Sequence, residues 1–124
     1  MRAIGEQKVE MVIEAEMAAY RERHGAADVA SAWRALERAH ILSQPFLVQH
    51  LASHWHMFSF AVALRDWREA AGQLFRLALV PLGSLTGRLP VGNTGRARVS
   101  AFRPMPMPSD LAALLSAGDK PAQT

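Results

Sequence analysis

Residues 32–78 decide the fold of this chain, and they read AWRALERAHILSQPFLVQHLASHWHMFSFAVALRDWREAAGQLFRLA. This stretch holds four of the five histidines, all three tryptophans and the strongest helical periodicity in the sequence. Apolar residues recur in it every three or four positions, which is the spacing that gives an α-helix one buried face. Gln44-Pro45 and Asp66 interrupt the pattern, so the stretch predicts three successive helices.

Working outward from this stretch, the same periodicity predicts one helix before it and a short one after it. Gly25 ends the first helix, and Pro81 ends the fourth. Asp66-Trp67-Arg68-Glu69 fits a capping box, in which the Glu69 side chain reaches back to the amide of Asp66. We expect the fourth helix to bury Trp67 and Leu74. The predicted helices are residues 6–23, 29–43, 46–65, 67–80 and 110–117.

These elements predict an all-α protein, a four-helix bundle made of two antiparallel hairpins. Residues 1–81 form the bundle, and residues 82–124 form an extended Gly/Pro-rich basic arm that carries the short last helix and packs on the same single domain. Residues 55–81 also fit the tetratricopeptide pattern of large and small residues, Ala-x-x-x-Phe-x-x-Ala before a proline. Tetratricopeptide-like packing of this hairpin is therefore an alternative within the same class.

Composition excludes several classes of function. Half of the residues are apolar, so most of the chain is expected to fold. There is no cysteine, which excludes disulfides, thiolate zinc sites and cysteine nucleophiles. The polar amino end lacks the apolar core of a secretory signal, and no stretch reaches the ~18 uncharged apolar residues of a membrane span. We expect a soluble cytoplasmic protein with no membrane association.

The segment between Ala70 and Ser109, which includes much of the arm, carries several arginines and no acidic residue. Such a segment can contact an anion or an acidic protein partner. Its aromatic residues are too few for the stacking platforms of a single-strand binder, so nucleic acid is not the expected partner. The turn of the arm is predicted at Gly92, Asn93 and Gly95. The candidate contact residues are Arg88, Arg96, Arg98 and Arg103.

Three histidines are expected to converge inside the bundle. If the second and third helices form an antiparallel hairpin closed near Gln44, His40 and His50 lie at nearly the same level. His54 lies one turn further along the third helix, on the same face as His50. We therefore predict a mononuclear site for zinc or iron held by these three imidazoles. Glu37 or Glu16 is the expected fourth ligand, or orients a ligand.

The metal site is weighed against two alternatives. In the first, the histidines and glutamates form a buried polar network that fixes the helix register, and the protein is a metal-free adaptor that binds a protein partner or a second copy in a helical groove. In the second, Glu37 and His40 act as acid and base of an enzyme, which is the least favoured reading. A full di-iron carboxylate centre is not expected, because the sequence offers one Glu-x-x-His pair where two are needed.

Several motifs, in this order, resemble one known family. They are Glu37-Arg38-Ala39-His40-Ile41-Leu42, the His50/His54 pair followed by Met57, Arg65-Asp66, Gly72-Gln73, Gly92-Asn93-Thr94-Gly95 and the Pro-Met-Pro segment. The resemblance spans roughly Trp33 to Leu114 and is to a family of small bacterial proteins known only as a domain of unknown function. It implies a helical bacterial protein with no established activity, substrate or cofactor. It also implies that the histidines and the glycine turn belong to the family pattern, which favours a functional site.

Overall fold

The computed structural model describes residues 4–86, 94–97 and 104–119. Over these residues the protein is all-helical and contains no strand, so the predicted fold class is confirmed. The helices are α1 (Ile4–Gly25), α2 (Val29–Ser43), α3 (Leu47–Ala63), α4 (Trp67–Thr86) and α5 (Ser109–Asp119).

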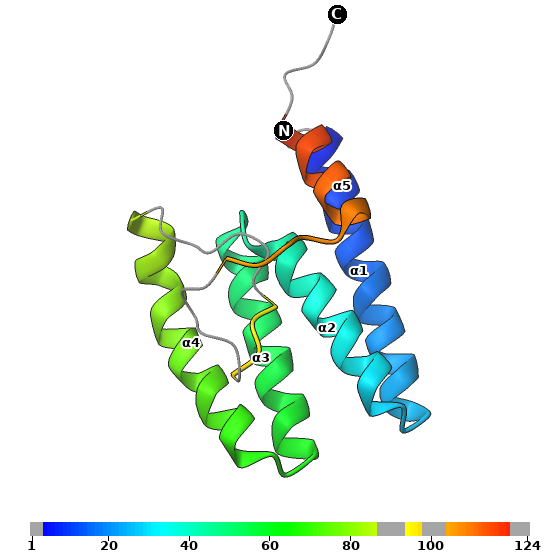
Figure 1. Ribbon diagram of the computed structural model, residues 1–124, viewed down its shortest axis with the longest axis vertical. Helices are drawn as coiled ribbons and strands as arrows, with labels where there is room; N and C mark the ends of the chain where they lie inside the picture. The colour runs from blue at the N-terminus through cyan, green and yellow to red at the C-terminus, as the bar shows by residue number, and fades with distance from the viewer. Residues whose placement is uncertain (1–3, 87–93, 98–103, 120–124) are drawn as a thin grey trace, which may run out of the picture.

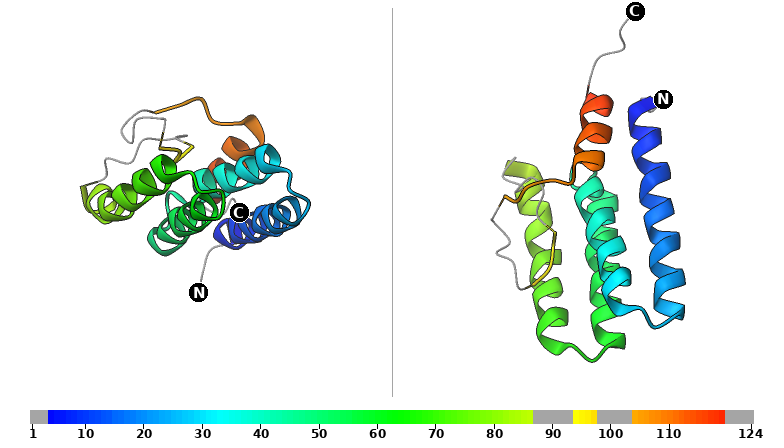
Figure 2. Two further views of the ribbon diagram at one scale, coloured as in Figure 1. Left: turned by 90° about the horizontal axis from the view of Figure 1, so that it is seen from below. Right: turned by 45° about the vertical axis from the view of Figure 1, so that its right-hand side comes forward.

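The four long helices run alternately up and down (Figure 1). Helix α1 packs along α2 and α3 packs along α4, so each predicted hairpin is present. Contacts between α2 and α3 join the two hairpins, and α5 covers α1 and α2 near one end (Figure 2). The interface between α2 and α3 is therefore the centre of the bundle.

Two apolar clusters hold this arrangement together. In the first, the ring of Phe60 on α3 lies 5.3 Å from the Tyr20 ring of α1 and 4.9 Å from the Trp33 ring of α2. Phe60 is 1% exposed, and burying such a side chain contributes roughly 1.5–3 kcal/mol. In the second cluster, Leu111 anchors α5 against Leu42 of α2. The first apolar cluster, which also includes Ala70 of α4, thus connects four helices, and the other fixes the last helix.

The predicted helix starts are confirmed by their caps. The Asp28 side chain accepts a hydrogen bond from the Ser31 amide, and the Asp66 side chain accepts one from the Glu69 amide. These bonds satisfy amide groups that have no partner within the helix. The second half of the predicted capping box is wrong, because the Glu69 carboxylate bonds to other groups, which are described below.

The predicted end of α4 at Pro81 is also wrong, because the helix continues to Thr86 with the proline inside it. Proline removes one backbone hydrogen bond and crowds the carbonyl four residues earlier, but it keeps a helical φ angle. Val80, directly before it, is 5% exposed and anchors this turn in the bundle. Packing of this turn therefore offsets the lost hydrogen bond at Pro81, and the helix continues. The division of the chain at residue 81 stays a prediction.

Helix α4 buries less of its apolar surface than its sequence predicts. Trp67 and Leu74 were expected in the core but are 63% and 51% exposed. The reason is the position of α4 at the side of the bundle, where α3 is its one packed helix neighbour among the described elements (Figure 1). A broad apolar stripe on such a helix exceeds the area that one neighbour can cover.

Among the described residues, no helix is both long and apolar enough to cross a membrane.

Candidate metal centre

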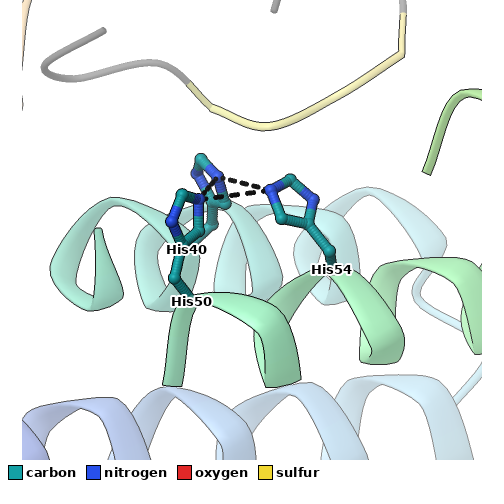
Figure 3. Close-up of side chains that lie close together, drawn as sticks. All are labelled: His40, His50 and His54. Carbon is teal, nitrogen blue, oxygen red and sulfur yellow. Dashed lines mark hydrogen bonds between the residues drawn. The ribbon is translucent and has the colours of Figure 1, made fainter. Parts of the chain in front are cut away.

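Three imidazoles meet between α2 and α3 (Figure 3). His40 lies near the end of α2, and His50 and His54 lie one turn apart on α3. Because the two helices are antiparallel and joined by a short turn, residues at similar distances from the turn face each other. All three side chains are 2–3% exposed. The predicted convergence of His40, His50 and His54 is confirmed.

The three Nε2 atoms form a nearly equilateral triangle. The separation is 3.0 Å between His40 and His50, 3.1 Å between His40 and His54, and 3.2 Å between His50 and His54. Nitrogen ligands of a tetrahedral zinc ion, each ~2.0–2.1 Å from the metal, lie about 3.3 Å from one another. The observed triangle is within a few tenths of an ångström of that spacing.

Burial keeps two of these rings neutral. It lowers the pKa of His50 to about 3, with a smaller contribution from the neighbouring His54, and it lowers the pKa of His54 to about 4. At neutral pH each of the two imidazoles therefore carries one N–H group and one lone pair. A lone pair on a neutral imidazole is what a metal ion requires.

Gln73 of α4 determines which nitrogen of His54 carries the proton. The Gln73 amide group donates hydrogen bonds to the Glu69 carboxylate and to the backbone carbonyl of Gly95, both at 2.8 Å. Since both partners can only accept, the amide orientation is fixed and its oxygen must accept from His54 Nδ1, 2.7 Å away. The proton of His54 is thus on Nδ1, and the lone pair of Nε2 points into the triangle.

The Glu69 carboxylate accepts hydrogen bonds from three residues next to the histidine site. It is 2% exposed, and its second carboxylate oxygen accepts from both Gln73 and the Ala97 amide. Its first oxygen accepts from Arg96 Nε at 2.6 Å. The Arg96 guanidinium also lies 3.7 Å from the centre of the Trp33 ring, a cation–π contact. The buried carboxylate is therefore paired, as a charge in a core must be.

Residues 94–97 pass over the three histidines (Figure 3), and we call them the strap. Gly95 has a φ of +85°, and a Cβ atom there would come within 2.8–2.9 Å of the His40 ring. A Cβ atom on Gly72 of α4 would overlap the side chain of Ala97. Two glycines thus allow the strap to lie directly against His40 and α4. The left-handed φ at Gly95 is a conformation that glycine adopts without strain. The predicted turn stays a prediction, because Gly92 and Asn93 lie outside the described residues.

Glu16 and Glu37, the predicted fourth ligands, do not join the three histidines. Glu16 accepts a hydrogen bond from Arg38 Nε at 2.9 Å. Glu37 pairs with Arg96 at 3.4 Å, and burial raises the pKa of its carboxyl group. Among the described residues, the group that can hold a metal ion consists of the three histidines. Both glutamates lie on the helices predicted for them, but each carboxylate forms an ion pair with an arginine.

The other predicted contact residues divide into two groups. Arg96 was expected to face an anion or an acidic partner, but its guanidinium is committed to Glu69, Glu37 and the Trp33 ring. Its contact with an anion or an acidic partner stays a prediction. A basic residue in a Gly-rich arm gives no sign that a buried carboxylate lies beside it. The remaining residues, Arg88, Gly92, Asn93, Arg98 and Arg103, lie outside the described part of the chain.

Sequence reasoning missed Glu69 and Gln73. Glu69 was accounted for by the capping box, which hid its second role. Gln73 is fully buried, and the sequence signal for it was its place in the Gly72-Gln73 motif. A glutamine on the inward face of a helix needs hydrogen-bond partners in the core, which was the available clue.

Comparison with known proteins gives one family match. A family described as "Protein of unknown function (DUF3703)" matches residues 7–115. The matched range contains the three histidines, Gln73, Glu69 and the strap. The chain matches no curated protein and no solved structure.

Proposed function

We propose a function from the site itself, because this chain belongs to that family of proteins of unknown function, whose description assigns no activity. The proposed function is the binding of one divalent transition-metal ion by the Nε2 atoms of His40, His50 and His54.

The nitrogen triangle is the observation that carries this proposal. Each Nε2 atom lies 3.0–3.2 Å from the two others. An imidazole nitrogen carries either one N–H group or one lone pair, which lies in the ring plane and points outward from the ring. Each nitrogen can therefore direct one bond at one partner. Three such atoms cannot all hydrogen-bond to one another, and His54 contributes a lone pair. Buried lone pairs that face each other are unfavourable, whereas a cation among them would satisfy all three.

The donor set favours zinc over iron. Zinc accepts three imidazoles and leaves the fourth tetrahedral position for water or another ligand. The common non-haem iron site uses two histidines and one carboxylate, and both candidate carboxylates here are paired with arginines. Cobalt, nickel and copper also bind imidazole. We propose zinc because the spacing of the Nε2 atoms is close to that of a tetrahedral zinc site. Cobalt is a suitable spectroscopic probe of the same site.

Gln73 and Glu69 support the proposal as orienting groups. A metal-bound imidazole usually donates its other N–H to a carboxylate or carbonyl, which fixes the tautomer and raises the basicity of the ligand. His54 does this through the Gln73 amide oxygen, and Glu69 holds that amide in place. His54 is thereby prepared for a ligand role without the metal.

The test is a zinc titration of untagged, metal-free protein. We expect one zinc ion per chain in competition with a chromophoric chelator, and a rise in the melting temperature when zinc is added. His54→Ala should weaken binding by at least a hundredfold. His56→Ala is the matched control, because it removes a half-buried histidine from the same helix outside the triangle and should leave zinc binding unchanged.

Two results would count against the proposal. One is wild-type protein that takes up no zinc and melts at the same temperature with zinc or chelator. The other is His54→Ala protein that binds zinc as tightly as the wild type. The first result would favour the alternative in which the histidines form a metal-free network inside an adaptor. The second would mean that zinc binds at another site.

A further inference from the structure

The side of the α3/α4 hairpin that faces away from α2 carries an exposed apolar stripe on each helix. The buried face of α3 contains the two ligand histidines and is turned to α2, so its opposite face points outward. On α4 the inward face carries Glu69 and Gln73 and meets the strap. Both α2 and the strap lie on one side of the hairpin (Figure 2). The two outward stripes are Val48, Ala52, Trp55, Ser59 and Val62 on α3, and Trp67, Ala71, Leu74, Phe75 and Ala78 on α4.

The two outward stripes, together called the outer α3/α4 face, expose several large apolar side chains. Single exposed apolar side chains are normal, but a contiguous patch of several hundred Å² marks an interaction site. Trp55 is 54% exposed, and Trp67 and Leu74 are exposed to a similar degree. With ~150–250 Å² for each aromatic side chain, the exposed parts of the large residues on this face amount to roughly 600 Å². One partner in a standard protein–protein interface buries ~800 Å².

The composition of the face suits a copy of itself. None of the ten residues carries a charge, so nothing in it selects a strongly acidic or basic partner. Large and small residues alternate along both helices: Trp55 lies between Ala52 and Ser59, and Leu74 lies between Ala71 and Ala78. In a two-fold arrangement the large residues of one copy can fill the spaces above the small residues of the other.

We propose that the outer α3/α4 face binds a second copy of this chain, so that the two hairpins form an intermolecular four-helix bundle. Such an isologous interface buries the tryptophans and phenylalanine that the bundle leaves in contact with water. The metal centres lie on the opposite side of each hairpin and take no part in the contact.

The experiment is sedimentation equilibrium of the full chain with a chelator present, so that metal-bridged association is excluded. We expect a dimer at micromolar concentration. Leu74→Glu places a charge in the middle of the face and should raise the dissociation constant at least a hundredfold without changing the helical circular dichroism. Met11→Glu is the matched control, because Met11 is 71% exposed on α1, away from this face. It should leave the dimer intact.

A second variant protects the test against misfolding. Ala71→Glu changes a small exposed residue on the same stripe and is expected to dissociate the dimer as well. A wild-type chain that remains a monomer at high micromolar concentration would overturn the proposal. This holds even if the monomer uses the same face to bind a different protein. A dimer that both glutamate variants leave unaffected would also overturn it, because the contact would then use another surface.

Discussion

The interface between α2 and α3 has two ends that are built in different ways. At one end Phe60 packs among apolar rings from α1 and α2, and at the other His40, His50 and His54 meet, backed by Gln73. The apolar end gains stability from the removal of surface from water, which depends mainly on volume and shape. The polar end is favourable when all of its groups have partners. The same two helices thus carry a stabilising apolar core and the polar site that we propose to bind a metal ion.

Among the substitutions, removing atoms at the apolar end should have the largest effect on stability. Phe60→Ala is expected to lower the free energy of unfolding by about 3–5 kcal/mol, because it leaves a cavity between three helices. Urea denaturation checks the magnitude. Zinc stoichiometry of the folded fraction should stay at one per chain. A loss below about 1 kcal/mol would show that the ring is not part of the packed core.

Removing an orienting group at the polar end should change metal affinity more than stability. Gln73→Leu leaves the Nδ1 proton of His54 without an acceptor, and zinc affinity is expected to fall about 10–100-fold. Competition titration with a chelator measures this change. Gln49→Leu is the matched control, since it removes a half-buried α3 amide that bonds Glu10 away from the triangle. Equal zinc affinity in Gln73→Leu and wild type would contradict the orienting role.

The strap should tolerate no side chain at Gly95, where it lies against the His40 ring. Gly95→Ala combines a left-handed backbone, which costs ~1–2 kcal/mol for an L-residue, with a contact to His40 that requires movement. We expect lower stability and weaker zinc binding, measured by thermal melting with and without the metal. Gly25→Ala should be neutral or slightly stabilising, because a Cβ there meets nothing within 4 Å. A neutral Gly95→Ala would mean that the strap does not press on His40.

The last prediction concerns the pH dependence of the metal-free protein. In the unfolded chain a histidine titrates near ~6.5, whereas burial lowers the pKa of His50 to about 3 and that of His54 to about 4. Between these values the unfolded state binds more protons, so the free energy of unfolding falls as the pH drops from 6.5 towards 4. Denaturation at several pH values measures the slope. His54→Gln should make the slope shallower. Phe60→Ala should lower the free energy of unfolding by the same amount at every pH and leave the slope unchanged.

Local chemistry and periodicity were sufficient to predict much of the fold and the convergence of the three histidines. The two aspartate caps and the level of His40 against His50 follow from spacing alone. Periodicity indicates which face of a helix is apolar, but it does not indicate how much of that face a neighbour will cover. For this reason Trp67 was expected in the core and lies exposed.

Partners far apart in the sequence were beyond local reasoning. Glu16 and Glu37 are placed correctly along their helices, but their hydrogen-bond partners come from other segments. Glu69 and Arg96 are 27 positions apart, and neither residue alone predicts the buried ion pair that they form. A charged residue near a helix start has a complete local explanation in capping, which conceals a second role.

The most direct test of the account is X-ray absorption at the zinc edge of the zinc-loaded protein. The account predicts a first shell that contains three imidazole nitrogens at ~2.0–2.1 Å, reduced to two in His54→Ala if any zinc is retained. A shell made of oxygen ligands alone, or a spectrum that His54→Ala leaves unchanged, would contradict it.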